Sequence, residues 1–376
     1  MLVQEFKVKA KPSQYAAIDE AIRTAQFVQN KALRYWMDNE KVGKYDLSKL
    51  CKQLAQEFSF AAELNSMARQ ASADRTWSAI SRFYNNCKKG IKPVGYPKFK
   101  KFARSVEYKT SGWKLSGPKR ILFTDKKGIG LLKLVGTWDL ARYPIELIKR
   151  VRLVRRADGY YCQFCVAVDR SEPQPVTGKT VGLDVGLASF YTDSNGHKEE
   201  NPRFYRKREQ RRKRLARMLS RKQKGSANRR KAHNRLARFD LKTSRQRKDH
   251  AIKLARAVVK SNDFIAYEDL RIRNMVRNRS LAKSMGDAGW YQFRLWIERY
   301  GEMFGKVTVA VEPAYSSQQC SSCGTVVKKS LSTRTHVCQC GCELDRDENA
   351  AINILNKALS TTGHVGTALL DKENAL

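Results

Sequence analysis

One segment of this sequence, residues 203–248, holds 21 lysines and arginines but only two acidic residues, Glu209 and Asp240. It contains few helix breakers and its leucines recur at helical spacing, which predicts two basic helices joined near Gly225-Ser226. A solvated charged face is one interpretation. A run this one-sided, in a chain of formal net charge +38, favours the other, contact with a phosphate backbone.

The rest of the composition indicates a folded protein. A chain of 376 residues is long enough for two or three domains, and 41% hydrophobic with 10% aromatic residues argues against global disorder. The positive surplus largely excludes an ordinary small-metabolite enzyme. The sequence has no apolar stretch of about 18 residues and no signal-peptide core at its N-terminus. We therefore expect no membrane contact, a cytoplasmic location and reduced cysteines.

The first 170 residues divide into a helical part and a strand-rich part. Apolar spacing predicts a helix from Ser13, its expected N-cap, to about Asn39, a second helix after Asp46 and a third over about 61–83. Glycines and prolines then interrupt the pattern. We expect a small barrel or sandwich from β-rich runs at 120–123, 130–135, 149–154 and 159–168. The last run contains Cys162 and Cys165, which as strand residues three apart face opposite sides and cannot share one metal ion.

A proline-containing linker at 171–178 separates this half from a second set of elements. The pattern predicts apolar strands at 180–192, 263–270 and 306–311, and helices at 287–303 and 347–359. We expect the polar tail, residues 360–376, to be frayed.

Five of the nine cysteines lie between Cys320 and Cys342, which favours a metal site over a disulfide framework. In a Cys-x-x-Cys-Gly knuckle two thiolates and backbone NH groups converge on one ion, and a second loop completes a tetrahedral zinc site without an open catalytic position. The first loop supplies Cys320 and Cys323. For the second we predict Cys338 and Cys340, because glycine follows Cys340 as it follows Cys323, with Cys342 as a third candidate. Free buried cysteines are the alternative.

Three acidic residues stand where a basic chain would not be expected to place them. Asp184 lies inside an apolar strand, Glu268 ends another, and Asp347 starts the last helix. Three such carboxylates are the ligands that two Mg²⁺ ions require for phosphodiester hydrolysis. Each also has an ordinary interpretation: Asp347 as a helix N-cap, Asp184 as a turn residue, and Glu268 or Asp269 as a strand-end charge.

The order and spacing of these motifs resemble the TnpB family, also called OrfB, of transposon-encoded RuvC-like nucleases, which is similar to the compact type V CRISPR effectors. The resemblance rests on the cysteine knuckle and on the motifs Val181-Gly-Leu-Asp184-Val-Gly-Leu, Ile265-Ala-Tyr-Glu268-Asp-Leu and Asp345-Arg-Asp347-Glu-Asn-Ala-Ala-Ile-Asn-Ile354. It extends to Phe27-Val-Gln-Asn30-Lys-Ala-Leu, Gly95-Tyr-Pro-Lys-Phe-Lys100 and Asp287-Ala-Gly-Trp290, so that only the tail lies outside it.

The resemblance implies an α+β multidomain protein. Its parts would be a wedge strand at 1–12, a helical recognition lobe at 13–95, a β-barrel wedge domain at 96–175, an RNase H-like RuvC α/β nuclease domain at 176–317 with a basic helical insert at 203–260, a zinc-binding target-nucleic-acid-binding insert at 318–343, and a final RuvC helix at 344–359. Asp184, Glu268 and Asp347 would be a DED triad holding two Mg²⁺ ions, with one structural Zn²⁺ on the cysteines.

The implied activity is RNA-guided cleavage of double-stranded DNA beside a short flanking motif. The guide RNA would derive from the transposon end, and base pairing would supply sequence specificity. The protein would act as a monomer in a prokaryotic cytoplasm, associated with the nucleoid when bound to DNA. A DNA- or RNA-binding transposition accessory or regulatory factor without cleavage is the main alternative. A guide-independent, structure-selective nuclease resembling RuvC is another.

Several assignments stay open at this stage. Asp345 rivals Asp347, which we prefer because the family's Asp-x-Asn-Ala-Ala motif places that acid at the helix start. The Cys338-x-Cys340 spacing departs from the family's usual Cys-x-x-Cys. Candidate nucleic-acid contacts, which otherwise are plain exposed residues, are Arg69, Gln70, Lys98, Lys100, Arg211, Arg212 and Arg214.

Overall fold

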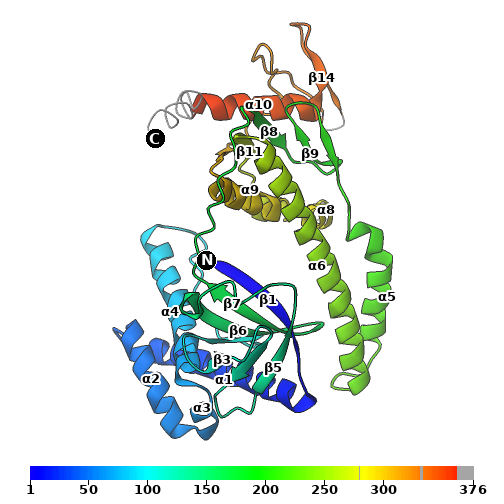
Figure 1. The fold of residues 1–376 in the computed structure, drawn as a ribbon. Coiled ribbons are helices and arrows are strands. Elements are labelled where there is room, and N and C mark those ends of the chain that lie inside the picture. Colours follow the sequence, from blue (N-terminus) through cyan, green and yellow to red (C-terminus); the bar gives the residue numbers. More distant parts are fainter. Residues whose placement is uncertain (279, 331–332, 362–376) are drawn as a thin grey trace, which may run out of the picture. The chain divides into compact units, whose positions relative to one another are not determined.

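The computed structural model describes residues 1–278, 280–330 and 333–361 (Figure 1). The chain forms two compact units that divide between Arg170 and Ser171. This division lies at the first residue of the predicted 171–178 linker, which contains neither helix nor strand. Most of the predicted tail, from residue 362, lies outside the described residues. No helix in the described ranges is long and apolar enough to cross a membrane.

The helices of the first unit are α1 (Pro12–Asp38), α2 (Lys44–Glu57), α3 (Ser59–Ala62) and α4 (Ser66–Lys88). Helix α1 begins before the predicted cap Ser13, because Pro12 occupies the first helical position, where its missing NH costs nothing. The predicted third helix is in fact two. Asn65 interrupts it by accepting a hydrogen bond from the Met67 NH at 2.9 Å, a capping interaction that apolar spacing does not reveal.

The strands of the first unit form one antiparallel sheet of order β2-β6-β7-β1-β5-β4-β3. Their bounds are β1 Leu2–Lys9, β2 Ser105–Tyr108, β3 Trp113–Leu115, β4 Arg120–Phe123, β5 Gly130–Val135, β6 Ile148–Arg156 and β7 Gly159–Val166. The N-terminal strand β1 lies in the middle, between β7 and β5. Apolar residues of α1, including Ile18 and Ile22, pack against this sheet.

The sheet corrects the expected β-barrel, because it does not close. Its outer strands β2 and β3 are consecutive in the chain, yet the described residues show no pairing between them. They have only four and three residues, and the chain passes from one to the other through residues 109–112. Such short strands offer too few backbone groups to complete a closed ladder.

The second unit contains a mixed five-stranded sheet of order β10-β9-β8-β11-β12. Its strands are β8 Thr180–Asp184, β9 Ser189–Asp193, β10 Lys198–Glu200, β11 Phe264–Glu268 and β12 Val307–Val311. Strands β8, β11 and β12 are parallel, whereas β9 and β10 are antiparallel to their neighbours. The single strand predicted at 180–192 is therefore two strands, separated by a turn directly after Asp184 that its apolar residues Val185 and Leu187 conceal.

Helices cover both faces of this sheet (Figure 1). On one face, α6 (Ala227–Ser261) and α9 (Trp290–Phe304) pack against Ile265 and Tyr267 of β11. On the other, α10 (Arg346–Thr361) packs against Phe264 and Ala266. This alternation follows from the two-residue period of a strand.

The predicted basic helices are α5 (Glu209–Ser220) and α6. They are joined by residues 221–226, and the Ser226 hydroxyl caps α6 by accepting a hydrogen bond from the Arg229 NH at 3.1 Å. The remaining elements of this unit are the 3-10 helix η2 (Arg206–Arg208), the short helices α7 (Ile272–Met275) and α8 (Ala282–Ala288), and the hairpin of β13 (Thr335–Val337) and β14 (Glu343–Asp345).

Candidate functional site

Two of the predicted acids meet at one edge of the second sheet. Strands β8 and β11 are parallel, with Leu183 opposite Tyr267. Asp184 and Glu268 are the next residues, so they lie at the carboxyl ends of neighbouring strands, whose backbones are about 4.8 Å apart. Leu183 and Tyr267 belong to the core beneath α6 and α9. Because successive side chains alternate, Asp184 and Glu268 face the opposite side, the side that α10 covers.

Asp347 reaches this place from the first turn of α10. The neighbouring Asp345 ends β14, and its Oδ1 accepts hydrogen bonds from the backbone NH groups of Asp347 at 3.0 Å and Glu348 at 3.3 Å. Its Oδ2 accepts one from Nζ of Lys198 at 2.6 Å. Asp345 therefore caps the helix and pairs with a lysine, while the carboxylate of Asp347 lies close enough to Asp184 to influence its ionisation.

The electrostatics of this edge are those of crowded carboxylates. Burial raises the pKa of Asp184 well above its usual range, and the charges of Glu268 and Asp347 raise it further, against a smaller opposing effect of Arg346. Burial also raises the pKa of Glu268, although a hydrogen bond donated by the Ser316 hydroxyl opposes this. The ionised carboxylates would be stabilised by a cation placed among them.

In this structure the three carboxylates do not converge on one point. Among the described residues, the groups of three or more metal-ligating atoms within 4.8 Å of one another all lie in the cysteine cluster. Oδ1 of Asp347 instead accepts hydrogen bonds from Arg346, at 3.1 Å from Nε and 2.9 Å from Nη2. The Oδ1 atom of Asp347 would have to exchange this partner before it could bind an ion shared with the other two acids.

Small residues set the distance between α10 and the sheet. A Cβ atom on Gly182 of β8 would lie 2.1 Å from the carbonyl oxygen of Ala351 and 2.9 Å from Cβ of Leu355. Ala350 and Ala351 of α10 are both buried. The glycine in the first motif and the alanines in the last one thus allow a close approach that brings Asp347 towards Asp184.

The cysteine cluster brings together the four thiols predicted from the sequence. The Sγ atoms of Cys320, Cys323, Cys338 and Cys340 lie within 4.8 Å of one another, with 3.7 Å between Cys320 and Cys340 and 3.5 Å between Cys323 and Cys338. A tetrahedral ion with metal–sulfur bonds of about 2.3 Å requires sulfur atoms about 3.8 Å apart. The thiols therefore fit a zinc ion, and Cys342 stands outside this group.

A histidine that the sequence reasoning missed lies beside the thiols. His336 is fully buried and forms a second group of potential ligands with Cys320 and Cys342. Burial would raise the pKa of Cys320, but backbone NH groups of Cys323 and Ser322, together with His336, lower it to about 5. The signal was present in the sequence, since His336 stands two residues before Cys338.

Two asparagines of the last motif connect α10 to the cysteine loop. The buried Asn349 accepts a hydrogen bond from the Ser321 NH at 2.9 Å and donates one to the Gln319 carbonyl at 2.8 Å. Asn353, one turn later, donates to the Ser316 carbonyl at 2.8 Å. Because Ser316 in turn donates to Glu268, this face of α10 positions both the cysteine loop and one of the acids.

Comparison with known proteins places the chain in a family. Residues 163–279 match the OrfB_IS605 family model, described as "Probable transposase", and residues 290–354 match the Cas12f1-like TNB domain model. A "Putative RNA-guided DNA endonuclease" of Streptomyces pristinaespiralis is 31% identical over 377 residues, which cover 95% of this chain and 90% of that protein. The chain belongs to the TnpB family.

Other similarities agree with this assignment. The "Putative RNA-guided DNA endonuclease InsQ" of Escherichia coli strain K12 is 29% identical to this TnpB-family chain, over 94% of the chain and 92% of InsQ. The structure titled "Cryo-EM structure of the Cas12f1-sgRNA-target DNA complex" has a similar fold, with a TM-score of 0.55 at 14% identity, over 92% of this chain and 82% of that one.

The nucleic-acid contacts predicted for this TnpB-family protein differ in their surroundings. Nη1 of Arg69 donates to the carbonyl groups of Ala61 and Leu64, both at 2.7 Å, so Arg69 stabilises the turn between α3 and α4. Arg212 joins α5 to α6 by hydrogen bonds to Asp240 at 2.7 and 3.1 Å. The other candidates are exposed or half-buried: Gln70, Lys98, Lys100, Arg211 and Arg214.

Proposed function

We propose that this TnpB-family protein is an RNA-guided endonuclease of a transposable element, which cleaves double-stranded DNA beside a short flanking motif. The observation that carries the proposal is that Asp184 and Glu268 end neighbouring parallel strands of a strongly basic chain, with Asp347 of α10 close enough to raise the pKa of Asp184. Two relatives that span nearly the whole chain bear the name RNA-guided DNA endonuclease. The reaction would be magnesium-dependent hydrolysis of a phosphodiester bond.

The donor set fits magnesium. Carboxylate oxygens are its preferred protein ligands. Burial and, to a smaller extent, the charges of Glu268 and Asp347 raise the pKa of Asp184, and a divalent cation beside it would offset these effects. Two Mg²⁺ ions, when bound, supply Lewis acidity that activates water and stabilises the leaving oxygen. The protein's own part would be to hold the ligands: the strands fix Asp184 and Glu268, Ser316 orients Glu268, and Asp347, whose Oδ1 accepts hydrogen bonds from Arg346, would complete the set.

The cysteine cluster is proposed to hold one structural zinc ion. Four thiolates leave no position open for a substrate, so the ion would stabilise the loop rather than act on DNA. Through Asn349 and Asn353 the same loop is tied to the helix that carries Asp347. Loss of the ion is therefore expected to disturb the acid cluster as well as the loop.

The basic surface supplies the proposed sites for a guide RNA and a target DNA. Helix α5 presents exposed arginines, Arg211 and Arg214, suited to a phosphate backbone. The heteroduplex of guide and target would provide sequence specificity. We propose that one protein molecule acts in each ribonucleoprotein.

The test is cleavage by the ribonucleoprotein purified after co-expression with the flanking transposon sequence. Asp184→Asn is expected to abolish cutting of a matched plasmid while a discrete RNA still co-purifies. Asp249→Asn, on the exposed surface of α6, is the matched control and should cut normally. If Asp184→Asn cuts at the normal rate, the active-site assignment is wrong, and if wild type binds RNA and DNA but never cuts, the protein is a binding factor.

A further inference from the structure

The first unit contains a cavity of about 460 Å³ between α1, α4 and the irregular segment 97–105. Its lining includes no carboxylate among the residues that the structure describes. Cationic side chains from α4 and the segment surround it instead: Arg75, Arg82, Lys98, Lys100 and Arg104. A concave site with this charge attracts an anion, and we name it the α1–α4 pocket.

Two sequence motifs meet at the wall of the α1–α4 pocket. The side chain of Asn30 donates a hydrogen bond to the Lys100 carbonyl at 3.0 Å and accepts one from the Lys100 NH at 2.8 Å. One turn earlier on α1, Gln26 donates to the Lys101 carbonyl at 3.1 Å and accepts from the Ala103 NH at 2.6 Å. Segment 97–105 is largely without regular secondary structure, so these amides fix its path.

An exposed aromatic ring lines the mouth of the pocket. Phe102 is 88% exposed, although the residues on both sides of it are held by Gln26. A phenyl ring left in water on a fixed backbone is a ready stacking surface, because it loses little freedom when a second ring covers it.

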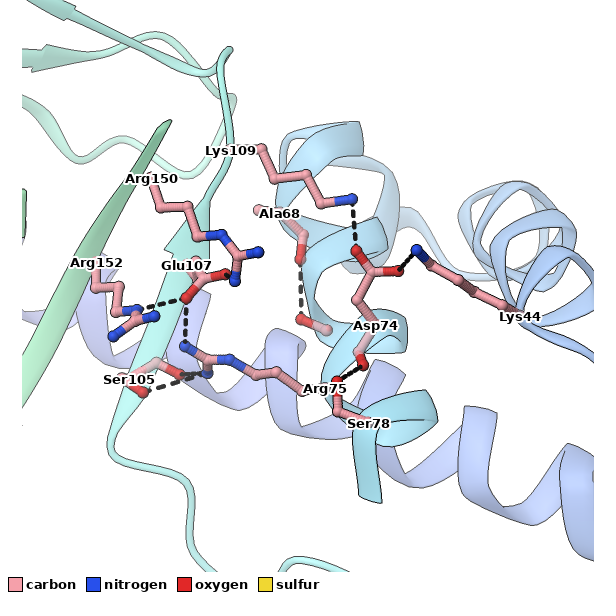
Figure 2. Close-up of polar contacts among 11 residues, drawn as sticks. Lys44, Ala68, Asp74, Arg75, Ser78, Ser105, Glu107, Lys109, Arg150 and Arg152 are labelled. Atoms are coloured by element: carbon pink, nitrogen blue, oxygen red, sulfur yellow. Dashed lines mark hydrogen bonds and ion pairs between the residues drawn. The ribbon is translucent and has the colours of Figure 1, made fainter. Parts of the chain in front are cut away.

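One of the pocket's cations, Arg75, is held in place by contacts with residues of β2 (Figure 2). Arg75 contacts the buried carboxylate of Glu107 at 3.2 Å and the Ser105 hydroxyl at 3.3 Å. Glu107 also pairs with Arg150 and Arg152, so one negative charge faces three positive ones. The group formed by Glu107 and the three arginines therefore keeps a net positive charge, and Glu107 orients the guanidinium groups. A phosphate site requires both properties.

We propose that the α1–α4 pocket binds one unpaired nucleotide of a nucleic-acid strand, with the phosphate among Arg75, Arg82 and Arg104 and the base stacked on Phe102. The choice of ligand class rests on the proposed function. The cavity volume lies within the range of ligand pockets, roughly 300–1,000 Å³. A base inside a duplex is already stacked on its neighbours, so only an unpaired base can lie on Phe102.

Photocrosslinking of the full chain tests the site directly. The probes are short single strands of oligouridine RNA and oligothymidine DNA, each carrying one 5-iodouracil, and the same strands in duplex form. We expect the single strands to crosslink at Phe102, located by mass spectrometry of the peptides, and the duplexes not to. If only the RNA strand crosslinks, the bound nucleotide belongs to the guide RNA. If only the DNA strand crosslinks, it belongs to an unpaired DNA strand. No crosslink at Phe102, or equal crosslinking by the duplexes, overturns the proposal.

Matched substitutions give a second measurement. Phe102→Leu is expected to weaken binding of the preferred single strand about tenfold, the effect of losing one stacked base, and Phe102→Trp to retain it. Tyr45→Leu removes another exposed aromatic ring, on α2, and should change nothing. Equal binding by Phe102→Leu and Tyr45→Leu contradicts stacking at Phe102.

The phosphate part of the site has its own signature. Arg82→Gln should reduce the slope of log affinity against log salt by about one, whereas Lys52→Gln on exposed α2 should leave it unchanged. These measurements need no cleavage. If the protein crosslinks at Phe102 but never cuts guided DNA, the proposed function is refuted and the nucleotide site at the α1–α4 pocket is supported. If it cuts guided DNA without the crosslink, the proposed function is supported and the nucleotide site is refuted.

Discussion

Replacing Gly182 with alanine perturbs the distance between β8 and α10 without touching a charged residue. The added Cβ would lie 2.1 Å from the backbone oxygen of Ala351, whereas ordinary contacts begin at 3.4 Å, so the helix must withdraw by more than 1 Å. Overpacking of this kind costs about 1–3 kcal/mol of folding free energy. Because α10 carries Asp347, a shift of about 1 Å is expected to lower the cleavage rate on the order of 100-fold.

The assay is the rate of guided cleavage of a matched plasmid, measured beside guide-RNA affinity and thermal unfolding. Gly286→Ala is the control, because a Cβ at Gly286 meets nothing within 4 Å. We expect Gly182→Ala to bind guide RNA normally, to unfold at a moderately lower temperature and to cut slowly. If it cuts as fast as Gly286→Ala, the contact between α10 and β8 does not position the catalytic acids.

Three further predictions concern separate parts of the molecule. Elemental analysis should find one zinc ion per chain. Cys320→Ser should lose this ion and melt at a lower temperature, whereas Cys342→Ser should keep it. Equal behaviour of the two variants contradicts the proposed ligand set. Asp347→Asn should abolish cutting, whereas Asp345→Asn should retain cutting and leave stability nearly unchanged, because asparagine caps a helix about as well as aspartate; the reverse result would exchange their roles. Glu107→Gln should destabilise the first unit by about 3 kcal/mol, because three arginines lose their buried partner, as chemical denaturation will show. Burial raises the pKa of Glu107, but Arg152, Arg75 and Arg150 lower it more, so its contribution to stability is complete above the unfolded pKa of about 4.3 and declines as the pH falls below that value. A wild-type advantage over Glu107→Gln that does not shrink as the pH falls below about 4.3 contradicts this sign.

The local periodicity of apolar residues was sufficient to predict most of the helices and strands. Strands β4 and β5 have the predicted bounds, and the basic helices join near Gly225-Ser226 as expected. The misses are places where a polar or small residue ends an element inside an apolar pattern. Asn65 separates α3 from α4, and the turn after Asp184 divides one predicted strand into two. Capping and turning depend on single hydrogen bonds, which average hydrophobicity does not record.

The residues of the candidate site could be predicted from the sequence, but their hydrogen-bond partners could not. Motif order in the sequence singled out Asp184, Glu268 and Asp347, yet nothing local showed that Asp347 bonds to Arg346 or that Ser316 donates to Glu268. Likewise, the sequence made Arg69 and Arg212 candidates for nucleic-acid contact, but in the structure both side chains form hydrogen bonds within the protein. Charge identifies candidates, whereas their availability depends on which neighbours the fold supplies.

The sequence by itself determined the basic character of the chain, the alternation that buries its strands, the cysteine knuckle and the acids that break the basic pattern, because each is a property of residue type and short-range spacing. Only the tertiary structure decided which of these features meet. The parallel register of β8 and β11 places Asp184 beside Glu268, and Gly182 lets α10 approach them. Packing also left Cys342 outside the thiol group and joined Asn30 to Lys100 across 70 residues. These contacts link segments far apart in the chain, so they follow from the packing of whole elements and not from any local pattern.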